Sequence, residues 1–169
     1  VGDEEGTLTS FENDGAGGFT ELTGAHDPFT GIAVGGHSAP IFVDLDGDGD
    51  LDVVVGNSEG KLKSFANDGA GGFTKLEGTD NPFAGIDVGY SSAPSFGDLD
   101  GDGDLDLVLG GYDGTLRTFT NDGAGSFTEL TGTNNPFYDI DVPGYSSPSL
   151  VDLDGDGDLD LMVGDEYGG

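Results

Sequence analysis

Aspartate crowds into three short segments of the chain, and each segment has the same spacing. The last segment reads VDLDGDGDLDLMVG, residues 151–164, and places five aspartates at alternate positions within nine residues. Two like charges about 4 Å apart repel by roughly 1 kcal/mol in bulk water and by several times more near a protein surface. The segment contains no basic residue to offset this repulsion. A bound cation is the simplest factor that would stabilise such a loop.

The spacing matches that of a calcium-binding loop. An EF-hand-like loop takes oxygen ligands from positions 1, 3, 5 and 9 and a backbone carbonyl from position 7, with glycine at position 6 for a sharp turn. Numbering from Asp44 puts Gly49 at position 6 and Val55 at position 12, where an EF-hand has glutamate. We therefore expect the ninth residue to carry more of the coordination and the position-7 aspartate to offer its carbonyl. The candidate metal ligands are Asp44, Asp46, Asp48, Asp50, Asp52, Asp98, Asp100, Asp102, Asp104, Asp106, Asp152, Asp154, Asp156, Asp158 and Asp160.

Three other interpretations of these loops are weaker. A merely solvated acidic turn would destabilise the fold three times over without compensation. Magnesium keeps several of its waters and rarely uses an all-protein carboxylate cage. A nonapeptide β-roll requires a nine-residue period that the chain lacks. We therefore predict about one Ca²⁺ per loop, three in all, bound at the 10⁻⁴ to 10⁻³ M typical of extracellular modules, with a loose or unfolded metal-free chain.

Composition limits the partners that the chain can bind. Its 169 residues carry 34 acidic and 4 basic side chains, a formal net charge of −30, which repels nucleic acids and anionic membrane surfaces. No apolar run approaches the roughly 20 residues that span a bilayer, so we expect neither nucleic-acid binding nor membrane insertion. The chain has no cysteine, so it must be held together by packing, backbone pairing or metal.

An internal repeat organises the whole chain. Asp44, Asp98 and Asp152 are 54 residues apart, and the same interval separates equivalent phenylalanines and prolines without insertions. We interpret residues 1–169 as a single repeat domain with units at 1–54, 55–108 and 109–162, followed by the start of a fourth unit at 163–169.

The sequence of each unit predicts four short strands. SFANDGAGGFTKL is typical of a β-hairpin with an Asn-Asp-Gly turn, and the Gly/Pro-rich stretch after it predicts a long connection whose Phe83 and Ile86 tuck beneath as plugs. SFGD and LDLVLGG then flank the aspartate loop as two more strands, of which the second is apolar on both faces and should lie inside. No stretch suits a stable helix, so the fold class is all-β: a β-propeller-like tandem of four-stranded antiparallel blades.

These motifs resemble a known family. APSFGDLDGDGDLDLVLGG followed by GTLRTFTNDGAGSFTEL is similar to the FG-GAP or VCBS-type repeat of integrin-like propellers and large bacterial surface proteins, and the resemblance covers the whole chain. It implies a propeller blade with a calcium loop between its first two strands, in extracellular or cell-surface proteins of adhesion, recognition or surface-layer type. Fold alone does not fix the activity of such a protein.

The repeat frame predicts one divided blade. VGDE at residues 1–4 recurs at residues 163–166, so whole blades are expected at about 38–78 and 92–132, and a third blade is split between about 147–163 and 7–23. An exposed half-blade presents a bare strand edge. We expect copies of the chain to complete it head-to-tail, in a ring or a filament, unless neighbouring repeats of a longer array do so.

Catalytic patterns are scarce. His26 and His37 occur in the first unit alone, and no Ser-His-Asp or phosphate-loop pattern is present, so we predict that the chain is not an enzyme. The favoured function is a calcium-stabilised structural or adhesive repeat. The alternative is a calcium-dependent glycan-binding module that stacks sugars on loop aromatics such as Tyr90, Tyr112, Tyr138 and Tyr145.

Overall fold

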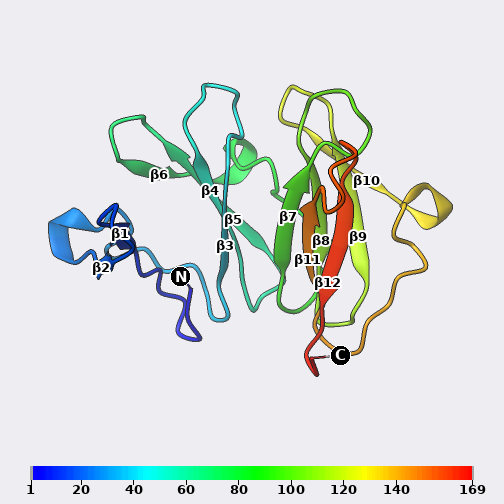
Figure 1. The fold of residues 1–169 in the computed structure, drawn as a ribbon, viewed down its shortest axis with the longest axis horizontal. Coiled ribbons are helices and arrows are strands. Elements are labelled where there is room, and N and C mark those ends of the chain that lie inside the picture. Colours follow the sequence, from blue (N-terminus) through cyan, green and yellow to red (C-terminus); the bar gives the residue numbers. More distant parts are fainter. Residues whose placement is uncertain (1, 169) are drawn as a thin grey trace.

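The computed structural model describes residues 2–168 as a row of antiparallel β-sheets (Figure 1). Two of the sheets have four strands each. Blade A consists of β3 (Ala39–Val43), β4 (Asp52–Gly56), β5 (Leu62–Asn67) and β6 (Phe73–Lys75), and blade B of β7 (Ala93–Gly97), β8 (Asp106–Gly110), β9 (Leu116–Asn121) and β10 (Phe127–Leu130), each paired in chain order.

Two further sheets have two strands each. The N-terminal hairpin pairs β1 (Phe11–Asn13) with β2 (Phe19–Glu21), and the C-terminal half-blade pairs β11 (Ser147–Val151) with β12 (Asp160–Gly164). The predicted all-β tandem of four-stranded blades is confirmed, and the four sheets do not close into a ring within residues 2–168. One 3₁₀ turn follows each hairpin, at Gly24–His26, Gly78–Asp80 and Gly132–Asn134, which the sequence had not indicated.

The second strand of each whole blade lies in the middle of the molecule, as its apolar sequence predicts. Every residue of β4 and of β8 is buried. Each of these strands has a hydrogen-bonded neighbour on both sides, β3 and β5 for β4 and β7 and β9 for β8. Valine and leucine suit such a strand because both of its faces are covered.

The core lies between successive blades. Val43 and Val54 of blade A pack against Leu107, Leu109 and Phe119 of blade B. The opposite face of blade A, with Val53, Val55 and Phe65, is covered by Leu8, Phe29 and Val34 from the first connection. Each blade therefore packs its two faces on different neighbours.

The long connections supply plugs for these interfaces, as predicted. Phe83 is buried and lies 4.9 Å from the Phe127 ring, centroid to centroid, while Ile86 packs at the edge of the same cluster. Phe29 repeats the arrangement one unit earlier, 4.8 Å from Phe73. The plugs fill the space where two twisted sheets diverge.

The blades approach most closely at a glycine that ends each second strand. A Cβ on Gly56 would come within 2.0 Å of the Ser92 carbonyl oxygen, and one on Gly110 within 2.1 Å of the Ser146 carbonyl oxygen. The Ser146 hydroxyl accepts a hydrogen bond from Gly111 N–H at 3.0 Å and donates to the Thr115 carbonyl at 2.8 Å. No residue with a side chain fits at Gly56 or Gly110.

Candidate metal sites

Each aspartate loop joins the first two strands of a blade. Residues 44–52 connect β3 to β4, residues 98–106 connect β7 to β8, and residues 152–160 connect β11 to β12. The glycines at the sharp turn have the positive φ that a side chain disfavours, 76° at Gly47 and 93° at Gly49 in the first loop. The loop therefore folds back on itself and can bring its carboxylates together.

Carboxylate oxygens converge once in every unit. Three aspartates in each loop place one oxygen each within 4.8 Å of the others, a separation that a single cation could bridge. The groups are Asp44, Asp46 and Asp48; Asp98, Asp100 and Asp106; and Asp152, Asp154 and Asp160. Oxygen-only donor sets of this kind suit a hard divalent cation. All three clusters could hold a metal ion.

The aspartate at the ninth position of the loop is an internal brace. The two carboxylate oxygens of Asp106 accept hydrogen bonds from the Leu99 N–H and the Asn121 N–H, both at 2.9 Å, and Asp106 is fully buried. Asp52 accepts from Leu45 and Asn67 in the same way. The residue therefore ties the start of the loop and the end of the third strand to the second strand.

The aspartate at the first position shapes the turn. The two oxygens of Asp98 accept hydrogen bonds from Gly101 N–H at 2.8 Å and Gly103 N–H at 3.0 Å. Asp44 and Asp152 make the equivalent pair of contacts in the other two loops. Because each oxygen keeps a second lone pair, these hydrogen bonds orient the carboxylates without preventing them from binding a cation.

The third position of the second loop, Asp100, is crowded by like charges. Loss of hydration and then the charges of Asp102 and Asp106 raise the pKa of Asp100 above its ordinary value. Raised carboxylate pKa values are expected where like charges share a site. A cation bound there would reverse the shift, because it favours the ionised carboxylate.

The six aspartates outside the three converging groups lie at positions 5, 7 and 9 of individual loops. The position-7 aspartates, Asp50, Asp104 and Asp158, belong to none of the groups. Asp50 and Asp104 instead approach the hairpin of the same blade, where a Cβ on Gly69 or on Gly123 would meet a carboxylate oxygen at 2.4 or 2.3 Å. The full set of fifteen ligands stays a prediction.

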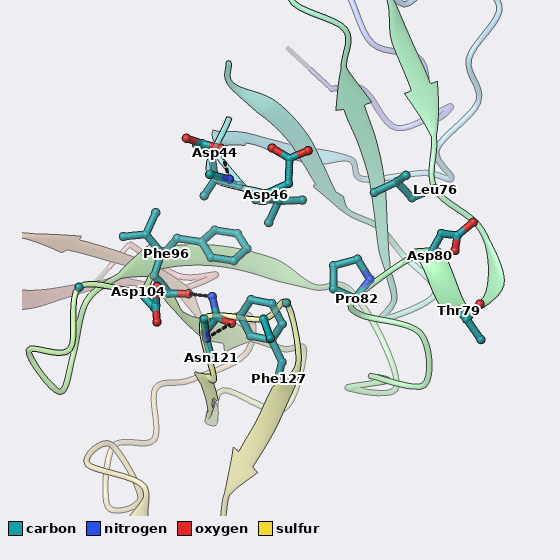
Figure 2. Close-up of a pocket in the computed structure, with 18 residues that line it drawn as sticks. Asp44, Asp46, Leu76, Thr79, Asp80, Pro82, Phe96, Asp104, Asn121 and Phe127 are labelled. Atoms are coloured by element: carbon teal, nitrogen blue, oxygen red, sulfur yellow. Dashed lines mark hydrogen bonds between the residues drawn. The ribbon is translucent and has the colours of Figure 1, made fainter. Parts of the chain in front are cut away.

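A cleft opens beside the first loop, between blades A and B. Its volume is about 650 Å³, and its lining combines carboxylates, including Asp44, Asp46 and Asp104, with apolar side chains such as Phe96 and Phe127. Figure 2 shows Asp44 and Asp46 of the first loop on one side of this space and Asp104 of the second loop on the other, with the Phe96 ring between them. The first metal cluster therefore lies at the rim of the cleft where blades A and B meet.

A buried asparagine forms the same hydrogen bonds in two of the units, which the sequence did not lead us to expect. Asn135 is buried, accepts from Thr118 Oγ1 at 2.8 Å and Phe137 N–H at 2.9 Å, and donates to the Leu116 carbonyl at 2.8 Å. Asn81 makes the equivalent contacts in the preceding unit. The recurrence of Asn-Pro-Phe at the repeat interval is the signal that would have identified this polar anchor.

The remaining candidates occupy the surface. His26 and His37 are both exposed. Tyr90, Tyr112 and Tyr145 gather around the turn between β8 and β9: the Tyr112 ring centroid lies 6.4 Å from that of Tyr90 and 4.9 Å from that of Tyr145. Tyr138 is exposed on the connection between β10 and β11. Across that same range, no helix is long and apolar enough to cross a membrane.

Comparison with known families identifies the repeat. The chain matches the FG-GAP-like repeat in three consecutive segments, residues 1–55, 44–109 and 98–163. The stretches shared by adjacent segments are 44–55 and 98–109, each of which is one aspartate loop with the start of its second strand. A search of curated proteins found no match. Because the matched segments together span residues 1–163, the chain belongs to the FG-GAP-like repeat family.

Proposed function

We propose that this chain is a non-enzymatic, extracellular repeat protein with a structural or adhesive role, in which calcium ions hold each blade together. The observation that supports the proposal most strongly is the convergence of three carboxylates in every aspartate loop. Each loop joins the first two strands of its blade, so an ion in the loop fixes both strands at once.

Calcium suits these clusters better than other cations. Six to eight oxygen ligands in flexible geometry are its usual coordination, whereas magnesium demands a smaller octahedral set and retains water. Zinc is disfavoured because the converging groups contain no histidine or cysteine. In blade B the ninth-position Asp106 belongs to the converging group and is braced by two backbone N–H groups, so this ligand is held in place before the ion arrives.

The charge of the chain favours an extracellular setting. A formal charge of −30 destabilises a compact chain through self-repulsion, and divalent ions reduce that charge. Calcium sites of extracellular modules typically bind at about 10⁻⁴ to 10⁻³ M, which matches the millimolar calcium outside cells. The FG-GAP resemblance implies the same location.

Calcium titration of the thermal unfolding transition tests the proposal. At a calcium concentration one hundred times Kd, each site adds about 2.7 kcal/mol to the free energy of unfolding. The melting temperature should therefore rise steeply with calcium, magnesium at equal concentration should have a smaller effect, and calorimetry should count three ions. A melting temperature unmoved by either chelator or calcium would refute the proposal.

A second candidate function is glycan binding, which the grouping of Tyr90, Tyr112 and Tyr145 favours. The Tyr90 and Tyr112 rings are exposed, and exposed aromatic faces stack on sugars. The Tyr145 hydroxyl accepts from Ser91 Oγ at 3.2 Å, which fixes the third ring in position. A glycan array in calcium tests this function, with the double substitution Tyr90→Ala and Tyr112→Ala as the control. Binding that survives the double substitution, or no binding at all, would count against it.

A further inference from the structure

We propose that the C-terminal half-blade of one copy docks on the N-terminal hairpin of a second copy, with β12 pairing alongside residues 8–13. The two pieces then form one complete four-stranded blade. This inference rests on the proposed structural role and specifies the partner, a second copy of the same chain, and the register of the contact.

Within residues 2–168, the N-terminal hairpin lacks a neighbouring strand that blades A and B have. β5 and β9 are six residues long and pair with β4 and β8, whereas β1, at the equivalent repeat position, is three residues long. Phe11 is 46% exposed, while the equivalent Phe65 and Phe119 are 1% and 3% exposed. The absent neighbour is therefore a second strand of the kind that β4 and β8 supply.

An apolar cleft marks the same place. Its volume is about 600 Å³, and it lies between the N-terminal hairpin and blade A, lined mainly by the rings of Phe11, Phe19, Phe29, Phe42 and Phe73. In the equivalent space between blades A and B, Val43 and Val54 pack beside Phe83, the repeat equivalent of Phe29. The cleft thus lies where the apolar side chains of one more first and second strand would pack.

The C-terminal half-blade carries side chains that match this cleft. Met162 occupies the repeat position of Val54 and Val108; it is 57% exposed, whereas both valines are 0% exposed. Leu153 and Val151 occupy the positions of Leu45 and Val43, which pack at the blade A–blade B interface, and both are exposed. The half-blade therefore presents the same apolar face that blade A uses to cover blade B.

The β4–β5 pairing gives the register across the two copies. Val53 pairs with Phe65 and Val54 with Ser64 within the chain. Moving each residue to its repeat equivalent pairs Leu161 with Phe11 and Met162 with Ser10 of the second copy. In blades A and B, the ninth-position aspartate accepts a hydrogen bond from the N–H of Asn67 or Asn121. The equivalent donor for Asp160 is the Asn13 N–H of the second copy.

Docking requires one of two equivalent segments, the N-terminal residues of one copy or residues 163–166 of the other, to leave its position. Residues 1–4 and 163–166 share the sequence VGDE and the same repeat position, and Gly2 already bridges Leu8 where Gly164 of a docked copy would lie. The contacts that one segment loses, such as the Ser38 N–H bond to the Asp3 carbonyl, can be remade by its counterpart. Exchange of equivalent segments between copies is a low-cost route to association.

Light scattering coupled to size exclusion tests the inference on the 169-residue chain in 10 mM calcium and 150 mM salt. We expect a mass at least twice that of one chain, either as a closed ring or as an open series. Met162→Asp should weaken association at least tenfold, since it puts a charge into the apolar contact. Tyr90→Asp is the matched control, because Tyr90 is also exposed but lies outside the N-terminal hairpin and the C-terminal half-blade, and it should leave association unchanged.

A cysteine pair tests the register independently. The chain has no native cysteine, so the double variant Ser10→Cys and Met162→Cys can form disulfides at these positions alone. Directly paired residues have Cα atoms about 4.5–5.5 Å apart, within disulfide range. We expect an intermolecular disulfide under mild oxidation. Glu12→Cys with Met162→Cys, one diagonal step out of register, should crosslink at least tenfold more slowly.

The outcomes separate this inference from the proposed function. A chain that calcium stabilises but that stays monomeric overturns the docking proposal and leaves the calcium proposal standing. Association that Met162→Asp does not reduce, or equal crosslinking by the two cysteine pairs, also overturns it. Association with the Ser10–Met162 crosslink, in a chain whose melting temperature neither chelator nor calcium moves, supports docking while refuting the calcium role.

Discussion

The brace at Asp106 and the crowded carboxylate at Asp100 should respond to substitution in opposite ways. Asp106→Asn keeps one oxygen for one backbone N–H and turns an amide N–H₂ toward the other, so one hydrogen bond to a charged acceptor is lost. Such hydrogen bonds contribute about 1.5–3 kcal/mol each. Because a change of 1 kcal/mol moves the melting temperature of a 150–250-residue protein by about 2–4 °C, we expect a decrease of about 3–12 °C.

The Asp106→Asn cost should be present at micromolar as well as millimolar calcium, because the brace needs no ion. Asp100→Asn instead removes a carboxylate whose pKa is raised by its surroundings, so at low calcium it should leave the melting temperature unchanged or slightly higher. At high calcium the same variant should bind one ion fewer than the wild type.

Differential scanning calorimetry across a calcium series provides the assay, with urea unfolding at the two extreme concentrations as a check. If the melting temperature of Asp106→Asn equals that of the wild type at low calcium, the two backbone contacts contribute nothing and the brace is refuted. Equal destabilisation by Asp100→Asn at all calcium concentrations would refute the ligand role of Asp100.

Three further predictions concern the core, the backbone and the hairpin turns. Phe83→Ala empties the plug position between blades A and B and should cost about 3–5 kcal/mol in urea unfolding. Gly114→Ala should destabilise the chain far more than Gly125→Ala. Both glycines have φ near +80°, but only a Cβ on Gly114 would lie 1.8 Å from the Val142 carbonyl oxygen. Equal melting temperatures of the two variants would contradict this. Backbone N–H groups of Ser126 and Ala124 lower the pKa of Asp122. The ionised Asp122 carboxylate therefore stabilises the folded chain fully above its unfolded pKa of about 3.9, and this stabilisation is lost as pH falls through the lower folded pKa. The stability gap between wild type and Asp122→Ala, measured in calcium by urea unfolding, should therefore close below about pH 4.

Much of the fold followed from local pattern. The strands of blades A and B, the hairpin turns and the plug Phe83 lie where apolar spacing and glycine position indicated. These features depend on residues close in sequence, so a regular repeat makes them visible. The predicted interior position of the second strand is correct for β4 and β8 but not for β12, whose residues alternate between exposed and half-buried. DLMVG has the same apolar character as its equivalents, and only the neighbouring strand decides whether it is covered.

In the aspartate loops, residue spacing predicted that carboxylates converge but not which other groups each carboxylate contacts. Alternate aspartates indicated convergence, and the structure brings three together in each unit. Spacing could not indicate that Asp52 and Asp106 also accept hydrogen bonds from Asn67 and Asn121, because those donors come from a strand 15 residues further on. The direction of a carboxylate depends on such tertiary contacts, which the sequence of the loop does not contain.

The contact between Gly56 and the Ser92 carbonyl oxygen, repeated at Gly110 and Ser146, has a consequence for how such chains change length. Backbone touches backbone there, so at this point the separation of successive units does not depend on the size of a side chain. Units that keep this glycine can be duplicated or deleted with the contact preserved. A single methyl group at Gly56 or Gly110 would wedge two units apart and change the curvature of everything beyond it.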